Sequence, residues 1–256
     1  MKKSIFLLGA MLFLVSCEKI ITVDLNESDS RYVIEGCINN HPGPYQVYIS
    51  ATRPSDSDQP VLIPGAMVII SDDYGQCDTL TDMGSGVYQT GTLQGIVGHR
   101  YRLEVFLDGM VFTSESVMGN VVPIDTITTA TISGIQQQLL VPVVSFSDPA
   151  GQINYYRYVL YVNGIRSAEL FLGKDEHSDG LSVNKMLRQG VSSGDSLEVE
   201  LQNIDEAVFE YFNDLAGLQG QVLAGLTPSN PVSNISGGAL GYFSAYAYSR
   251  KAVKVN

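Results

Sequence analysis

The chain has 256 residues, and its 15 basic and 27 acidic side chains give a formal net charge of −12. An acidic surface repels the phosphates of nucleic acids and the head groups of anionic lipids, so we expect no binding to DNA or RNA. Only 16% of the residues are charged, and Gly, Ser, Thr and Val are plentiful, which favours a mainly β protein.

The first residues have the pattern of an export signal. Lys2 and Lys3 supply a positive start, and residues 5–15 form an apolar stretch. A membrane-spanning helix needs about 20 apolar residues, whereas a signal-peptide core is as short as this stretch. Residues 1–16 are therefore predicted to be a cleaved signal peptide. Its removal takes away two lysines and no acidic residue, which changes the formal charge from −12 to −14.

Cleavage is expected directly before Cys17, because Leu14-Val15-Ser16-Cys17 looks like a lipobox. The thiol of Cys17 would receive a diacylglyceryl group, and the small residues before it would admit the processing peptidase. Two or three acyl chains hold a protein firmly on a bilayer. We therefore predict a lipoprotein attached to a membrane through Cys17, with residues 17–30 as a tether. An ordinary signal peptide with a chance cysteine is the alternative.

Short strands with turns between them follow the tether. Asp108-Gly109 is the strongest of the turn signals, since this pair is typical of tight hairpins. Several short strands at such spacing indicate a β-sandwich, and we place a first domain at residues 31–118. Its predicted strands are 32–34, 45–49, 67–70, 77–81, 86–90, 101–107 and 110–116.

A second β-rich domain with one helix is predicted at residues 119–256, after a linker at 121–125. Asn163-Gly164 is a further hairpin signal. Asn203 and Glu206 resemble a capping box, and the apolar residues after them fall on one face, which predicts a helix at 204–216. The strands expected here are 125–133, 139–147, 154–163, 165–172, 197–202 and 239–249. In the last of them Tyr242, Tyr246 and Tyr248 share one side.

Cys37 and Cys77 are the only thiols besides Cys17. Export to an oxidising compartment permits a disulfide between them. Nothing in the sequence brings the two together, so a bridge and two free thiols both stay open.

Part of the first domain resembles a known class of module. Pro64-Gly65-Ala66, Gly86-Val87-Tyr88 and Tyr101-Arg102-Leu103 are similar to segments of transthyretin-like or carboxypeptidase-regulatory-like Ig modules. In such modules a small residue starts a strand, a glycine turns it and a tyrosine packs the sandwich. The resemblance implies an Ig-like or transthyretin-like β-sandwich for residues 31–118.

The whole mature chain resembles the Bacteroidota lipoprotein family known as domain of unknown function 4249. The resemblance implies an outer-membrane lipoprotein. Members of this family are often discussed together with TonB-dependent receptors and have no agreed activity. The resemblance also implies that lipoproteins exported to the cell surface often carry a run of acidic residues after the lipidated cysteine. Here only Glu18 follows Cys17 directly, so the periplasmic side and the cell-surface side both stay open. The resembling segments are Cys17-Glu18-Lys19, Tyr32-Val33-Ile34-Glu35-Gly36, Gly43-Pro44-Tyr45, Gly65-Ala66, Ser71-Asp72-Asp73, Pro123-Ile124-Asp125, Asn154-Tyr155-Tyr156-Arg157, Asn234-Ile235-Ser236-Gly237-Gly238 and Gly241-Tyr242-Phe243.

The residue types that most often catalyse reactions or bind metals form no convincing motif. His41, His99 and His177 lie far apart, without the spacing of a helical metal pair. No nucleophile elbow is expected. We therefore predict no catalytic residue, cofactor or metal site. A hydrolase would be indicated only if folding placed His99 or His177 beside a serine and a carboxylate.

Two loops and a group of tyrosines have competing interpretations. The acidic loop 173–180 loosely suggests calcium binding but lacks the EF-hand register, so a solvated loop is predicted. The glycine-rich loop 225–238 is the best candidate for contact with a ligand or partner. Tyrosines on the strand 154–163 would offer a platform for sugar rings, although Tyr156 and Tyr158 share a face that is expected to be core.

We therefore expect a membrane-anchored, non-enzymatic envelope lipoprotein. Its expected role is that of an accessory or ligand-binding partner of a TonB-dependent outer-membrane uptake system. A structural or adhesive envelope protein on the same scaffold is the alternative.

Overall fold

The computed structural model describes residues 30–52, 60–133, 138–176, 178–223 and 230–256. The predicted signal peptide, the lipid site Cys17 and nearly all of the tether therefore lie outside the described residues. Within the described part the chain is mainly β and has one helix, α2 (Glu206–Leu223). No helix among the described residues is both long and apolar enough to cross a membrane.

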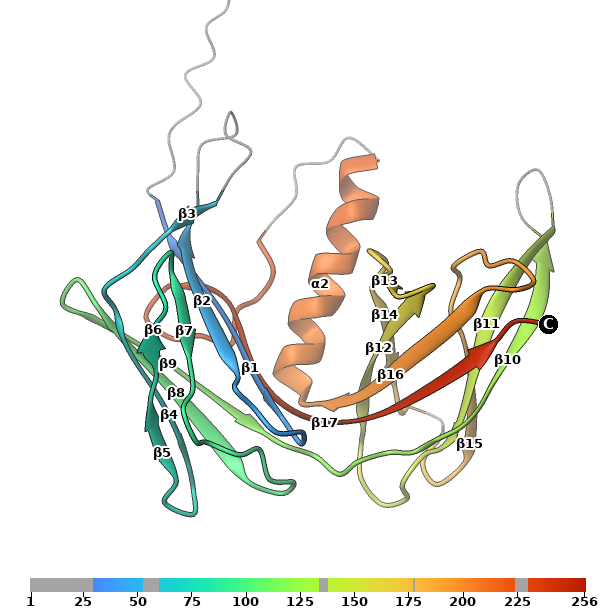
Figure 1. Ribbon diagram of the computed structural model, residues 1–256, viewed down its shortest axis with the longest axis horizontal. Helices are drawn as coiled ribbons and strands as arrows, with labels where there is room; N and C mark the ends of the chain where they lie inside the picture. Colours follow the sequence, from blue (N-terminus) through green and yellow to red (C-terminus); the bar gives the residue numbers. More distant parts are fainter. Residues whose placement is uncertain (1–29, 53–59, 134–137, 177, 224–229) are drawn as a thin grey trace, which may run out of the picture.

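The described strands form three sheets of ten, four and three strands. The sheets are arranged as two sandwiches, which lie on either side of α2 (Figure 1). The strands are β1 (Tyr32–Asn39), β2 (Gln46–Ala51), β3 (Val61–Leu62), β4 (Met67–Asp72), β5 (Cys77–Thr79), β6 (Thr81–Asp82), β7 (Val87–Gln89), β8 (Arg100–Leu107), β9 (Met110–Val117), β10 (Ile124–Ser133), β11 (Gln138–Ser147), β12 (Tyr155–Val162), β13 (Ile165–Arg166), β14 (Phe171–Lys174), β15 (Ser182–Met186), β16 (Ser196–Ile204) and β17 (Leu240–Lys254).

The first sandwich packs the four-stranded sheet β5-β4-β8-β9 against one end of the ten-stranded sheet, β6-β7-β2-β1 and the start of β17. Its core is built from the alternating inward residues of these strands, as the period-two pattern predicts. Tyr88 and Tyr101 are among its largest fully buried side chains. The hydroxyl of Tyr88 accepts the N–H of Ala66 at 2.9 Å and donates to the carbonyl of Ile63 at 3.0 Å, so this buried hydroxyl is satisfied.

The second sandwich packs the three-stranded sheet β10-β11-β15 against the other end of the ten-stranded sheet, β12-β16 and the end of β17. Phe146, Tyr156 and Tyr158 lie at its centre. The rings of Phe146 and Tyr156 meet edge to face with centroids 4.9 Å apart. The prediction that Tyr156 and Tyr158 share a buried face is confirmed, since each is 2% exposed.

Strand β17 belongs to both sandwiches. Its first half pairs in parallel with β1, from Val33 opposite Leu240 to Asn39 opposite Tyr246. Its second half pairs antiparallel with β16, ending with Ser196 opposite Lys254. The ten-stranded sheet therefore continues across the predicted boundary between residues 118 and 119, and β17 crosses the middle of the molecule in Figure 1.

Helix α2 begins two residues later than the capping-box pattern predicted. Asn203 still pairs with Ala247 in the sheet, so it does not cap the helix. Asp205 caps the helix instead, because its Oδ1 accepts the N–H of Val208 at 2.9 Å. The helix then buries its predicted apolar face and continues to Leu223, beyond the predicted end at 216.

Most predicted strands are present, and both hairpin signals are confirmed. The turn pairs Asp108-Gly109 and Asn163-Gly164 have positive φ at both residues, as the tight hairpin turn requires. The prediction of one strand at 165–172 was wrong, because the chain bends after β13 and resumes as β14. Strand β15 was not predicted, since its polar sequence SVNKM has no clear apolar alternation.

We predict that Gly241→Ala destabilises the protein by at least about 2 kcal/mol. Gly241 lies opposite Ile34 in the parallel pairing and has a φ of +99°, and an added Cβ would lie 2.0 Å from the carbonyl oxygen of Ile34. Urea denaturation measures the change. Gly217→Ala is the matched control, because nothing approaches that helical position and alanine there should stabilise by roughly 0.5–1 kcal/mol. Equal stability of the Gly241→Ala variant and wild type would contradict the β1–β17 register.

Candidate functional site

Strand β12 has a pocket on each of its faces, because its residues alternate in direction. Arg157 and Tyr161 face one pocket, and Tyr156 and Tyr158 face the other. We call the first the sheet pocket. It has a volume of about 260 Å³. It is lined by Cys37, Asn39, Arg157, Val159, Tyr161, Arg166, Glu200, Gln202, Phe212, Tyr242, Ser244, Tyr246, Tyr248 and Arg250.

The sheet pocket holds three arginines in different electrostatic surroundings. Arg250 is neutralised, since it pairs with Glu200 at 2.9 Å and with Glu198 at 3.2 Å. Arg157 lies over the ring of Phe212, 3.9 Å from the ring centroid, and burial lowers its pKa from the ordinary arginine value. Among the described residues neither Arg157 nor Arg166 forms an ion pair. The pocket therefore offers two guanidinium groups that no carboxylate of the described chain neutralises.

Tyrosines of β17 form one wall of the sheet pocket. Tyr242, Tyr246 and Tyr248 point to the same side of the strand, as predicted, while Phe243 between them is core. Burial raises the pKa of Tyr242 to about 12, and burial raises the pKa of Tyr246 and Tyr248 as well. These hydroxyls therefore stay protonated at neutral pH and can donate hydrogen bonds to a bound molecule.

Two small polar residues, Ser244 and Cys37, also line the sheet pocket. Ser244 is 2% exposed, and its Oγ has no hydrogen-bond partner among the described residues. Cys37 of β1 is half-buried, and burial raises the pKa of its thiol. Cys37 and Cys77 are both free. Cys77 lies exposed on β5 in the four-stranded sheet, so the disulfide considered from the sequence does not form in this structure.

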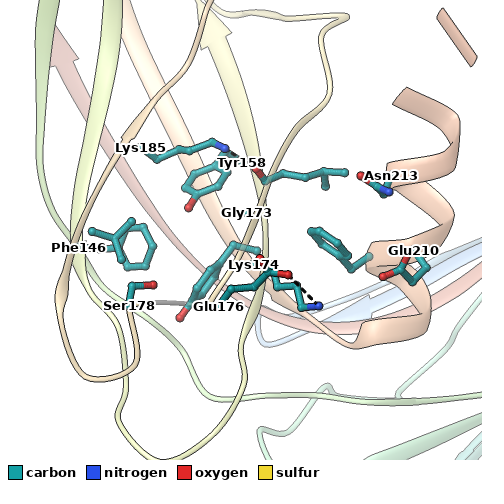
Figure 2. Close-up of a pocket in the computed structure, with 13 residues that line it drawn as sticks. Phe146, Tyr158, Gly173, Lys174, Glu176, Ser178, Lys185, Glu210 and Asn213 are labelled. Atoms are coloured by element: carbon teal, nitrogen blue, oxygen red, sulfur yellow. Dashed lines mark hydrogen bonds and ion pairs between the residues drawn. The ribbon is translucent and has the colours of Figure 1, made fainter. Parts of the chain in front are cut away.

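We call the second pocket the helix pocket. It lies between β14, β15 and the residues Phe209, Glu210 and Asn213 of α2, and has a volume of about 530 Å³. Figure 2 shows Phe146 and Ser178 on one side of it and Glu210 and Asn213 of the helix on the other. Its lysines are already engaged. Lys185 donates to the carbonyl of Leu172 at 2.5 Å, and Lys174 pairs with Glu176 at 3.2 Å. The helix pocket is therefore larger than the sheet pocket but offers less free positive charge.

The structure does not assemble a catalytic group around the described histidines. His99 Nδ1 lies 2.8 Å from Asp72 Oδ2, and its ring stacks on Tyr74 with centroids 4.1 Å apart. No hydrogen bond among the described residues joins His99 to a serine. The ring of His41 lies against that of Tyr248 in a tilted arrangement, with centroids 4.3 Å apart. His177 lies outside the described residues.

One serine motif was overlooked in the sequence. Gly190-Val191-Ser192-Ser193-Gly194 has the Gly-x-Ser-x-Gly letters of a nucleophile elbow. An elbow joins a strand to a helix, whereas this segment is a turn that leads into β16. The N–H of Ser192 donates to Asp195 Oδ2 at 2.8 Å, which closes the turn. The segment is therefore structural.

The described part of the loop 225–238 is fastened to the first sandwich. Ser236 Oγ lies 2.7 Å from Thr113 Oγ1, and the side chain of Asn234 bonds to both backbone groups of Phe243. Residues 224–229 lie outside the described part. The predicted contact of this loop with a partner stays a prediction.

The prediction of a solvated loop at 173–180 was wrong in part, because Gly173 and Lys174 belong to strand β14 and Asp175 is buried. Glu176 and Asp179 are exposed, but Asp175 is only 5% exposed. Its carboxylate turns inward because the N–H and the hydroxyl of Ser178 both donate to Asp175 Oδ1 at 3.0 Å. A local turn of this kind is hard to recognise from charge alone.

Comparison with known protein families gives a match over nearly the whole chain. A family model described as "Domain of unknown function (DUF4249)" matches residues 18–252. None of the curated proteins matches the chain.

We predict that Cys37 is alkylated by iodoacetamide at least about tenfold more slowly than Cys77, because burial raises the pKa of Cys37 and only the thiolate reacts. Mass spectrometry of the two cysteine peptides from the folded protein measures both rates. In denaturant the two rates should converge. A disulfide-linked pair of peptides, or equal rates in the folded protein, would contradict the environments of these thiols.

Proposed function

The chain belongs to the family of domain of unknown function 4249, and on this premise we propose that it is a non-enzymatic, lipid-anchored envelope protein that binds a small anionic ligand in the sheet pocket. The proposal includes the outer membrane of a Bacteroidota cell as its location and a TonB-dependent uptake receptor as its partner. It also includes an Ig-like or transthyretin-like identity for the first sandwich.

The observation that carries the proposal is the pair Arg157 and Arg166. Both line a concave site, and no carboxylate of the described chain neutralises either one. Guanidinium groups bind carboxylates and phosphates through charge-assisted hydrogen bonds. The protein as a whole is acidic, whereas three arginines and one glutamate line this pocket. Tyrosine rings beside it would pack against the uncharged part of the ligand.

The composition of the sheet pocket favours binding over catalysis. Among the described residues no histidine lines it, and the one serine there, Ser244, has no hydrogen-bond partner. A serine nucleophile needs an adjacent base to remove its proton. The lone cysteine, Cys37, has a pKa raised by burial, which is opposite to the shift of a reactive thiol.

A variant of the anchor tests the location and the partner. We expect the wild-type chain to fractionate with the outer membrane and to co-purify with a TonB-dependent receptor from its native host. Cys17→Ser removes the acceptor of the lipid, so this variant should move to the soluble fraction and lose most of the receptor. Cys77→Ser is the matched control and should behave like wild type. Recovery of no transporter with the wild-type protein, together with loss of attachment or envelope integrity on deletion, would favour the adhesive alternative.

The ligand site is tested by protection of Cys37 from iodoacetamide, with sulfate, citrate and glucuronate as probes. At least one probe should slow alkylation of Cys37. Arg157→Met keeps most of the side-chain length and removes the charge, so it should weaken protection roughly tenfold to hundredfold, the loss expected for one charge-assisted hydrogen bond.

Arg188→Met is the matched control, because Arg188 is exposed and does not line the sheet pocket. Protection that is equal in the Arg157→Met variant, the control and the wild type would place the anion elsewhere. Absence of protection by every probe would count against an anionic ligand.

A further inference from the structure

Three carboxylates converge at one end of the second sandwich. Asp148 directly follows β11, Asp175 directly follows β14, and Asp179 lies in the same loop as Asp175. One oxygen of each lies within 4.8 Å of the others. Asp148 is far from the other two in the sequence, so the acidic run at 173–180 by itself shows only part of the group.

Two of these carboxylates are buried, and in each of them only one of the two oxygens has a hydrogen-bond partner among the described residues. Asp148 is 4% exposed and Asp175 is 5% exposed. The Oδ2 atoms of both are buried and have no hydrogen-bond partner among the described residues. Buried charges in proteins are paired with opposite charges or coordinate metals, because an unpaired one loses its hydration without compensation. Two neighbouring carboxylates with free oxygens therefore require a cation or a proton between them.

The other oxygen of each carboxylate is held in place. The hydroxyl of Tyr156 donates to Asp148 Oδ1. The N–H and the hydroxyl of Ser178 donate to Asp175 Oδ1, and the N–H of Gly151 donates to Asp179 Oδ1 at 2.6 Å. These partners orient the three groups before any ligand arrives, as the outer shell of a metal site does. The Oδ2 atoms of Asp148 and Asp175 are left without a hydrogen-bond partner among the described residues.

The surrounding backbone also fixes the two loops against each other. The N–H of Asp148 donates to the backbone carbonyl of Leu181 at 2.9 Å, and the N–H of Asp175 donates to the backbone carbonyl of Asn154 at 3.0 Å. The buried amide of Asn154 donates to the carbonyl of Gln152 at 3.1 Å. The cluster is therefore built on backbone that is tied to the sheets rather than on exposed side chains alone.

We propose that Asp148, Asp175 and Asp179 form a binding site for a divalent cation, with Ca²⁺ as the preferred ion. The described members of the cluster offer only oxygen, which suits hard cations such as Ca²⁺ and Mg²⁺. Mg²⁺ is usually held by one or two carboxylates and several waters, whereas Ca²⁺ accepts more carboxylate oxygens in a flexible geometry. The exposed carboxylate of Asp179 gives the ion a path from solvent.

A bound ion would join two sheets of the second sandwich. Asp148 continues β11 of the three-stranded sheet, and Asp175 continues β14, which pairs with β12 of the ten-stranded sheet. The same ion would support one wall of the helix pocket, because Tyr156 and Ser178, which bond to the cluster, both line that pocket. This site is separate from the sheet pocket and does not depend on the proposed function.

Tb³⁺ luminescence and thermal unfolding of the full-length protein test the proposal. The chain has no tryptophan, so excitation of tyrosine should sensitise bound Tb³⁺ through Tyr156, and Ca²⁺ should displace it. With a Kd on the order of 10⁻⁴ M, as in extracellular calcium modules, Ca²⁺ at 100 times the Kd should raise Tm by roughly 5–10 °C over the protein in EDTA.

Asp148→Asn and Asp175→Asn should abolish the sensitised signal and the Ca²⁺-dependent rise in Tm. In EDTA their Tm should equal or exceed that of wild type, because each change removes repulsion between buried like charges. Glu176→Gln is the matched control, since it removes one charge from the same loop outside the cluster, and it should retain the full response. If a buried variant does not fold, Asp179→Asn at the exposed ligand gives the same test. A Ca²⁺ response that persists in the aspartate variants, or that is absent from wild type, would overturn the site.

Discussion

The pairing of β17 with β1 is the interaction on which the rest of the structure depends. It joins the first and last strands of the described fold by a parallel ladder, and Gly241 admits the close approach of the two backbones. Ser116 of β9 strengthens this junction, because its hydroxyl accepts the N–H of Ala245 at 2.7 Å and donates to Asp205, the cap of α2. The hydroxyl of Ser116 therefore links the final strand, the first sandwich and the start of the helix.

This junction explains where the sheet pocket lies. A strand shared by two sandwiches has one face in the core, and the other face of β17 lines the sheet pocket. Helix α2 covers part of that open face through Phe212. The polar and aromatic residues beside it remain accessible at the floor of a concavity, which is where sites on rigid β scaffolds are expected. Arg157 is held there by the ring of Phe212 and not by an ion pair.

Strand β12 also separates two sites of opposite charge. Arg157 points into the sheet pocket, while its neighbour Tyr156 points the other way and donates to Asp148 of the acidic cluster. Alternation along one strand therefore keeps free positive charge and buried negative charge on opposite faces of a sheet. In a protein of net charge −12, this alternation places the proposed anion site and the proposed cation site on opposite faces of the sheet.

Local features of the sequence were sufficient to predict most strands and hairpins, and to predict which residues of some strands share a face. The mainly β class and the hairpins at Asp108-Gly109 and Asn163-Gly164 follow from short-range patterns, because strand alternation and turn geometry are properties of adjacent residues. The shared side of the β17 tyrosines follows in the same way. Only the tertiary structure decided that β17 completes both sandwiches, that Arg157 and Arg166 meet Tyr246 in one pocket, and that Asp148 joins Asp175. These contacts join residues that are distant in the chain, and their formation depends on strand order and packing that no local pattern encodes.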